Sequence, residues 1–205
     1  MVDNADDVTV SADEALARLM EGNARFLRGE PRNTHTPKEV LADLAEGQRP
    51  FATILGCSDS RVPPELVFDA GFGELFIIRV AGNVLGPSIA GTLQYAATHL
   101  HTPLFVVLGH EGCGAVEAAI TSRFHGARHK SRIASLLKNI VPALDDLDPT
   151  LLHAALLKMA VEANVRWTIH RLLESREGKA RVAKGDVKLV GAVYDLGTGR
   201  VRFLE

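Results

Sequence analysis

The sequence predicts an α/β fold with one domain, built on a central, mostly parallel sheet flanked by helices. Two observations support this prediction. From residue 51 onward, short apolar runs of strand length each end at a glycine or a polar turn and are followed by a helical pattern. The runs are apolar at consecutive positions, as is typical of parallel strands covered on both faces. A chain of 205 residues has the length of one such domain.

The N-terminal part of the chain lacks this pattern. Residues 1–10 are polar and acidic, and we expect them to form a flexible tail. Ser11 and Glu14 have the spacing of a capping box, and apolar residues then recur at helical intervals. These features predict an amphipathic helix over residues 12–28, whose apolar face must pack either on its own domain or on a partner subunit.

The segment after this helix is rich in proline and leads to the first strand. A short helix is expected within it, around residues 38–45. We therefore predict a single α/β domain over residues 11–205, in which residues 11–50 form an N-terminal helical arm.

The sheet is predicted from three apolar runs and a C-terminal hairpin. The runs cover residues 51–56, 75–80 and 103–109. The helices expected between and after them cover residues 63–68, 87–100, 112–124, 136–141 and 151–174. Residues 186–194 and 200–204, joined by Leu-Gly-Thr-Gly, predict a closing antiparallel hairpin.

Composition argues against several classes of partner. The formal net charge is −2, from 23 Lys+Arg and 25 Asp+Glu, so the chain lacks the general basic field that attracts nucleic acid. No apolar stretch approaches the roughly 20 residues of a membrane-spanning helix, and the N-terminus is acidic where a signal peptide is basic. We therefore expect a cytoplasmic protein that binds neither nucleic acid nor membranes.

The two cysteines of the chain and one histidine follow predicted strands. Cys57 comes directly after the first strand, and His110 and Cys113 follow the third. Ligands bind beyond the carboxyl ends of parallel strands, so these side chains would meet if the two strands are neighbours. Two thiolates and one imidazole are good zinc ligands, and three protein ligands leave one position open, as in catalytic zinc sites. The pattern therefore predicts a zinc centre that performs chemistry.

Other interpretations of these residues fit less well. Cysteine is among the most buried residue types, so either cysteine taken alone is compatible with simple core packing. A phosphatase loop of the Cys-x₅-Arg type would need arginine at position 63, where this chain has Pro63. Residues 109–114 have the glycine spacing G-x-x-G-x-G, which differs from the G-x-G-x-x-G of dinucleotide-binding loops.

Asp59 and Arg61 extend the predicted site. A carboxylate two residues beyond a metal ligand can accept a hydrogen bond from zinc-bound water, and an arginine can hold that carboxylate in place. The alternative is an ordinary salt bridge, because alternate residues of an extended segment share one side. If Arg61 moved away, Asp59 would be able to take the fourth zinc position and close the site.

These motifs resemble those of the β-class carbonic anhydrases. The resemblance is carried by CSDSR at residues 57–61 and HEGCG at residues 110–114. Two intervening segments, RVAGN at residues 79–83 and GTLQYA at residues 91–96, are also similar to that family's pattern. The likeness extends from the first predicted helix to the final hairpin.

The resemblance implies an activity and an assembly. One Zn²⁺ per subunit would be held by Cys57, His110 and Cys113, and zinc-bound hydroxide would hydrate CO₂ reversibly to bicarbonate and a proton. Asp59, anchored by Arg61, would orient that hydroxide. The family also implies a homodimer or a higher even oligomer, in which the N-terminal helices embrace the partner.

Within the family the chain is similar to the plant-type subgroup. The residues that the resemblance places in the substrate pocket are Gln48, Phe76, Ala81, Tyr95 and Gly114. Gln48 would reach the substrate across the subunit interface, and Ala81 departs from the valine often found there. Ile54 stands where the bicarbonate-inhibited subgroup has tryptophan, so we do not expect that subgroup's regulatory site.

Two alternatives to CO₂ hydration stay open at this stage. Hydroxide attack on CS₂ or COS needs the same kind of site, so a hydrolase of these molecules is one alternative. A non-catalytic zinc-binding regulatory module is the other, although the presence of Asp59 and Arg61 favours catalysis. With two thiolate ligands the metal-bound water is less acidified than in a three-histidine site, which predicts activity that rises towards alkaline pH.

Overall fold

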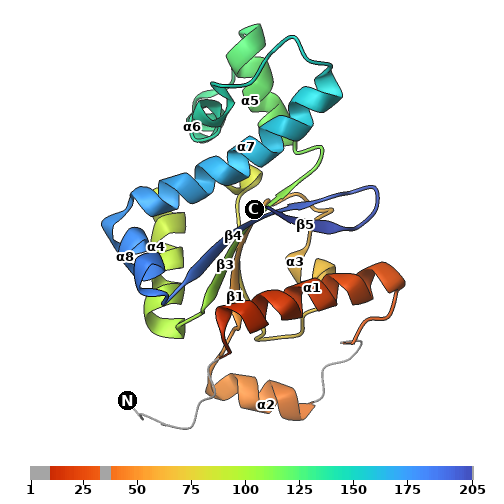
Figure 1. Cartoon of the computed structure of the whole chain (residues 1–205), viewed down its shortest axis with the longest axis vertical. Coiled ribbons are helices and arrows are strands. Elements are labelled where there is room, and N and C mark those ends of the chain that lie inside the picture. Colours follow the sequence, from red (N-terminus) through yellow and green to blue (C-terminus); the bar gives the residue numbers. More distant parts are fainter. Residues whose placement is uncertain (1–9, 33–37, 205) are drawn as a thin grey trace.

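The computed structural model describes residues 10–32 and 38–204 and has a five-stranded sheet at its centre (Figure 1). The strand order is β2-β1-β3-β4-β5. The strands are β1 (Ala52–Gly56), β2 (Leu75–Arg79), β3 (Leu104–His110), β4 (Lys188–Tyr194) and β5 (Val201–Leu204). The first four pair in parallel, and β5 pairs antiparallel with β4. The predicted mostly parallel sheet with a C-terminal antiparallel hairpin is therefore confirmed.

The remaining elements are helices and helical turns. They are α1 (Ala12–Arg28), α2 (Lys38–Glu46), α3 (Pro64–Val67), η1 (Ala81–Asn83), α4 (Pro87–Tyr95), η2 (Ala96–Leu100), α5 (Gly114–His125), α6 (Ser131–Leu137), η3 (Val141–Leu144), α7 (His153–Glu174) and α8 (Arg176–Lys184). The predicted tail falls at residues 1–10, of which only residue 10 lies within the described part of the chain.

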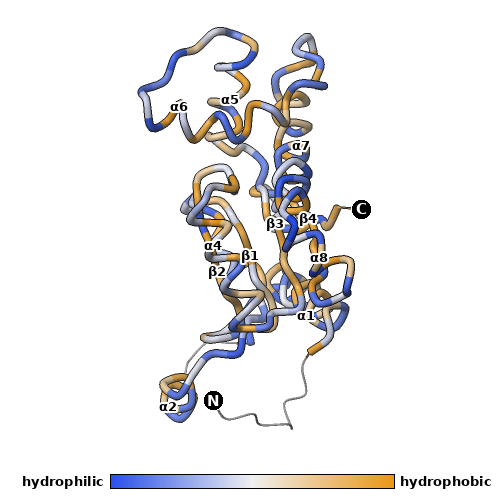
Figure 2. Tube along the Cα trace, turned by 90° about the vertical axis from the view of Figure 1, so that its left-hand side faces the viewer, coloured by the Kyte–Doolittle hydropathy of each residue, from blue (hydrophilic) through white to orange (hydrophobic). Residues whose placement is uncertain are grey.

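Helices cover both faces of the sheet. Every residue of β1 and β3 is buried, as the continuous apolar runs predicted. On one face, α1 and α3 pack on alternate residues such as Ile54 and Val106. On the other face, α5 and α7 pack on the remaining ones, such as Val107, and α4 packs over Leu55. In Figure 2 the apolar colours accordingly concentrate on the central strands.

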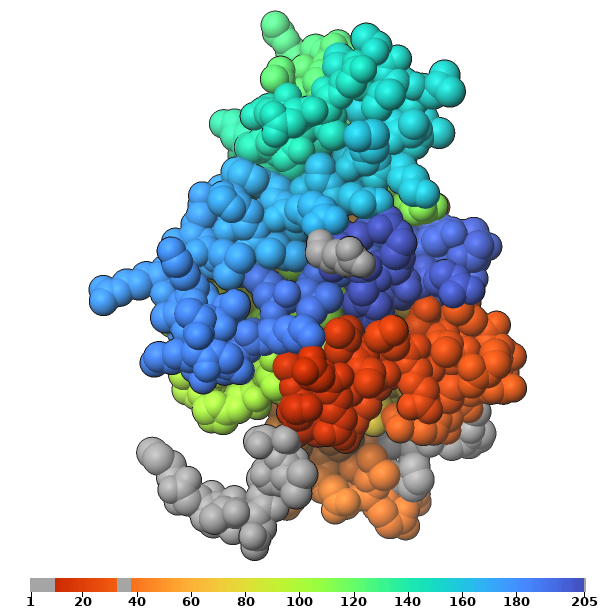
Figure 3. Space-filling model, in the orientation of Figure 1, coloured from red at the N-terminus to blue at the C-terminus, as the bar shows by residue number. Residues whose placement is uncertain are grey.

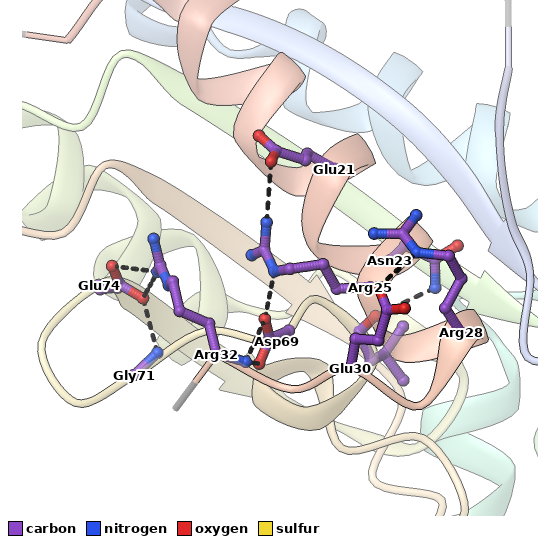
Figure 4. A network of polar contacts seen from close by, with 10 residues as sticks. Glu21, Asn23, Arg25, Arg28, Glu30, Arg32, Asp69, Gly71 and Glu74 are labelled. Carbon is purple, nitrogen blue, oxygen red and sulfur yellow. Dashed lines mark hydrogen bonds and ion pairs between the residues drawn. The ribbon is translucent and has the colours of Figure 1, made fainter. Parts of the chain in front are cut away.

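The first helix forms where its cap predicted and packs on its own domain. The Ser11 hydroxyl accepts a hydrogen bond from the Glu14 backbone N–H at 3.2 Å, and α1 ends at Gly29 in the left-handed region. Leu19 is completely buried against the sheet. A polar network joins the helix to the loop before β2, in which Asp69 binds Arg25 (Figure 4).

The second helix differs from α1 because it buries none of its residues. Val40 and Leu41 on α2 are 39% and 49% exposed. Figure 2 shows α2 at one end of the molecule, set apart from the sheet, and Figure 3 shows it in orange at the same end. Unlike α1, this part of the predicted arm therefore has no face that is buried on its own chain.

The helix predictions need correction in three places. The apolar residues at 136–141 do not form one helix, because the Asn139 amide donates to the Leu136 carbonyl at 3.1 Å and ends α6, and η3 begins beyond it. The helix α8 is absent from the prediction because it buries no residue and so carries no apolar period. The predicted helix at 87–100 is α-helical only to Tyr95 and continues as the wider turn η2.

In the parts of the chain that the structure describes, no helix combines the length and the apolar character needed to cross a membrane.

Candidate metal centre and active site

Three candidate metal ligands meet at the carboxyl edge of the sheet. Cys57 follows β1 and His110 ends β3, and these two strands are hydrogen-bonded neighbours in parallel. Cys113 comes three residues after His110 and precedes the first turn of α5, with Gly112 between them at φ +64°. A left-handed residue at this turn allows the chain to reverse within three residues, which is the role glycine fills without steric cost.

The ligand atoms of these three residues lie within 4.8 Å of one another, and all three side chains are buried. The two sulfur atoms are 3.9 Å apart, close to the separation of about 3.8 Å expected for two thiolates on a tetrahedral zinc ion. His110 Nδ1 lies 3.0 Å from the Glu111 carbonyl oxygen and must donate to it. Its Nε2 is buried and has no hydrogen-bond partner among the described residues.

This orphaned nitrogen supports the fit to a metal ion. A neutral imidazole that donates through Nδ1 carries a lone pair on Nε2, and a buried acceptor without a partner costs free energy. A cation bound between the two sulfurs and this nitrogen would satisfy it. The donor set of two sulfurs and one nitrogen suits Zn²⁺ in particular.

The two cysteines have different electrostatic surroundings. The pKa of the Cys57 thiol is lowered, first by a hydrogen bond with the Cys113 thiol, and also by the Gly82 backbone N–H at 3.3 Å. The pKa of Cys113 is raised because it lies beside the sulfur of Cys57 and is buried. Negative charge is thus favoured on Cys57, and a divalent cation would displace the proton that remains on Cys113.

Asp59 and Arg61 form the pair that the sequence predicted. Arg61 donates to both carboxylate oxygens of Asp59, at 2.8 and 2.7 Å, and its backbone N–H donates at 3.0 Å. These hydrogen bonds hold the pKa of the Asp59 carboxyl well below its usual range. One oxygen of Asp59 lies 3.8 Å from His110 Nε2, so the carboxylate borders the metal cluster while it stays bound to Arg61.

Sequence reasoning missed a second arginine that supports this loop. Arg79, the last residue of β2, donates through Nε to the Cys57 carbonyl at 2.9 Å and through its terminal nitrogen to the Asp59 carbonyl. Arg79 lies in the RVAGN segment that resembles the family's pattern. Its contacts with Cys57 and Asp59 depend on the pairing of β2 with β1, which the segment alone does not indicate. The arginine fixes the backbone that carries both Cys57 and Asp59.

The predicted substrate-pocket residues fall into two groups. Ala81 lies in η1 and is followed by Gly82, whose backbone N–H donates to Cys57 Sγ. Gly114 begins α5 directly after Cys113. Phe76 on β2 and Tyr95 on α4 contact each other with their ring centroids 6.2 Å apart, and Tyr95 is 47% exposed. The structure therefore brings Phe76 and Tyr95 together as a half-exposed aromatic pair.

Gln48 lies elsewhere in the same chain. It lines a cleft with residues that precede the strands, such as Phe51 and Pro103, whereas Cys57 follows them. The length of β1 thus separates Gln48 from the metal cluster of its own chain.

Fold and site together define an α/β protein with a buried Cys-His-Cys cluster, a candidate metal centre, at the carboxyl edge of its sheet. The family model described as carbonic anhydrase matches residues 52–201, which is well over half of the chain. The chain therefore belongs to the carbonic anhydrase family, and its fold and relatives place it in the β class.

Individual relatives agree with this assignment. The chain is 36% identical over 188 residues to carbonic anhydrase 2 of Mycobacterium tuberculosis, covering 89% of this chain and 87% of that protein. It is 36% identical over 187 residues to a carbonic anhydrase of Mycolicibacterium smegmatis, covering 89% and 88%. Its structure is similar to the β-carbonic anhydrase CcaA, with a TM-score of 0.73 and 26% identity over 93% of this chain and 95% of that one. The Coccomyxa β-carbonic anhydrase in complex with acetazolamide also has a TM-score of 0.73, at 27% identity, covering 92% and 86%.

Proposed function

We propose that this protein is a zinc-dependent carbonic anhydrase that converts CO₂ and water reversibly to bicarbonate and a proton. The observation that carries the proposal is the convergence of two buried thiols and an unpartnered imidazole nitrogen beside an Asp–Arg pair. Membership of the carbonic anhydrase family supports the same reaction.

Cys57, His110 and Cys113 would hold the zinc ion in this proposal. Zinc bound there would acidify a coordinated water molecule and so supply the nucleophile for CO₂. The two thiolates offset the charge of the ion, whereas three neutral histidines would not, so acidification is weaker here. Activity should therefore rise towards alkaline pH.

Asp59 orients the nucleophile in this mechanism. Because Arg61 keeps the carboxylate ionised far below neutral pH, Asp59 acts as a hydrogen-bond acceptor and not as a proton store. By accepting a hydrogen bond from the nucleophile, Asp59 would direct the nucleophile's lone pair towards the carbon of CO₂. Arg61 acts through Asp59, holding both of its oxygens and preventing the carboxylate from turning to the metal.

The remaining pocket residues suit a site shared between two subunits. Ala81 and Gly114 lie beside the ligands of their own chain, while Gln48 lies at the other edge of the sheet. We propose that Gln48, Phe76 and Tyr95 complete the pocket of a partner subunit and that α2, which buries nothing in its own chain, packs on that partner. The protein would then be a homodimer or a higher even oligomer. We also propose that it belongs to the plant-type subgroup. A cytoplasmic location stays a prediction.

A subunit-complementation experiment tests the shared site. Gln48→Ala and Cys57→Ser homodimers should both be impaired. A heterodimer of the two variants, isolated with two affinity tags, contains one intact site if Gln48 serves the partner, and should regain about half of the wild-type activity. A heterodimer no more active than the mean of its parents would show that Gln48 does not act across an interface.

The proposed reaction itself is tested by stopped-flow CO₂ hydration on protein of measured zinc content. We expect one zinc per subunit and a turnover that increases from neutral to alkaline pH. Parallel assays with CS₂ and COS separate the hydrolase alternative, which predicts faster turnover of those molecules than of CO₂. Stoichiometric zinc without turnover of any of the three would point to a non-catalytic module and overturn the proposal.

A further inference from the structure

The turn η1 lies against the metal ligand Cys57 and has an unusual backbone. The Gly82 backbone N–H donates to Cys57 Sγ at 3.3 Å, inside the buried core. Gly82 has φ +70° and the next residue, Asn83, has φ +44°. A residue other than glycine pays roughly 1–3 kcal/mol for a left-handed conformation, so the surrounding structure must hold this turn in place.

The helix α7 supplies that restraint through two side chains one helical turn apart. Asn164 Nδ2 donates to the Gly82 carbonyl at 2.8 Å, and Thr168 Oγ1 donates to the Asn83 carbonyl at 3.3 Å. Both residues are 1% exposed. Both backbone polar groups of Gly82 are therefore held, its carbonyl by Asn164 and its N–H by Cys57.

Close packing prevents the turn from adjusting by itself. A Cβ atom at Gly82 would lie 2.7 Å from Ile140 Cδ1 and 3.1 Å from Ala115 Cβ. A Cβ atom would be crowded at these distances. The absence of a side chain at Gly82 therefore lets the backbone of η1 pack closely against Ile140 and Ala115. Small movements of α7 would consequently be passed to the N–H that faces Cys57.

The amide at position 164 is only partly satisfied in the core. Asn164 Oδ1 is buried and lacks a hydrogen-bond partner among the residues that the structure describes. An unsatisfied buried carbonyl costs about 1–3 kcal/mol. A leucine of similar shape would remove this cost at position 164 but would leave the Gly82 carbonyl without its donor. The benefit that offsets this penalty lies in the hydrogen bond to Gly82.

We propose that Asn164 and Thr168 are positioning residues of the metal centre. By holding η1, they keep the Gly82 N–H directed at the Cys57 sulfur, which stabilises this ligand as a thiolate and slows release of the metal. Groups beyond the direct ligands commonly change metal affinity by about 10- to 100-fold. This inference rests on the proposed zinc centre and adds a role for a helix that supplies none of its ligands.

The test measures release of zinc from the holoenzyme into an excess of a chromophoric chelator. Asn164→Leu should release zinc about 10-fold faster than wild type, and Thr168→Val should change the rate in the same direction by less. The matched control is Leu156→Ala, which removes a 2% exposed side chain from the core face of the same helix. Each variant is measured at the same interval below its own melting temperature, so that loss of stability is matched.

A spectroscopic measurement adds a readout that loosened packing would leave unchanged. In the cobalt-substituted protein, the thiolate-to-cobalt charge-transfer band should shift in Asn164→Leu and Thr168→Val but stay in place in Leu156→Ala. Equal release rates in Asn164→Leu and Leu156→Ala, with unshifted bands, would overturn the inference. If wild-type protein bound no zinc, the proposed function would fail instead, so the two failures are distinguishable.

Discussion

Replacing Asp59 with asparagine is expected to leave zinc bound and to lower kcat for CO₂ hydration by about 100- to 1,000-fold. Asparagine keeps the shape of the side chain but places an amide donor where one carboxylate oxygen accepts. In the unmodified protein Arg61 donates to both oxygens of Asp59. In the variant Arg61 would lose its ionic partner and half of this bidentate contact. The nucleophile would then bind without the acceptor that aims it.

The pH dependence of this variant makes the prediction sharper. Because the pKa of Asp59 is held far below neutral, its carboxylate is ionised throughout any practical assay range. Asp59→Asn should therefore lower activity at every pH, because no titration of Asp59 falls within the assay range. Zinc analysis and stopped-flow assays from neutral to alkaline pH provide the measurement.

A matched control for Asp59→Asn is Asp148→Asn. Asp148 is also a hydrogen-bonded aspartate with a lowered pKa, but its partner is Thr150 in a loop that precedes α7. Activity of Asp148→Asn should equal that of wild type. An Asp59→Asn enzyme with unchanged kcat would refute the orienting role of the carboxylate.

Replacing Cys57 with serine is expected to have the largest effect on metal content. Zinc should fall from one ion per subunit to below about one tenth, and CO₂ hydration should fall with it to background. A serine hydroxyl gives up its proton far less readily than a thiol and is a poorer zinc ligand. The change would also replace the sulfur atom that accepts from the Gly82 N–H and contacts Cys113.

Metal analysis after exhaustive desalting measures this prediction, and circular dichroism establishes that the variant is folded. Ser58→Ala is the appropriate control, because Ser58 is the exposed neighbour of Cys57 in the same loop. It should keep full zinc content and activity. A Cys57→Ser protein with stoichiometric zinc would remove Cys57 from the ligand set.

Local sequence determined much of the architecture. Continuous apolar runs predicted β1 and β3 because strands covered on both faces need apolar residues at every position. The same kind of run predicted β2, although it is an edge strand that is only partly buried. The cap at Ser11 predicted the start of α1, since capping is a contact between residues three apart. The helix α8 and the break after α6 escaped prediction, because charged surface helices and side-chain caps leave little mark on apolar periodicity.

The sequence alone also determined which residue types stand at the strand ends: two thiols, an imidazole and an Asp-x-Arg pair. Only the tertiary structure decided that β1 and β3 are neighbours. This pairing brings Cys57 to His110, which is 53 positions further along the chain. It likewise placed Asn164 beside Gly82, a contact between residues 82 apart. Periodicity and motifs report interactions along the chain, whereas these contacts depend on sheet order and helix docking, which are set by packing of the whole core.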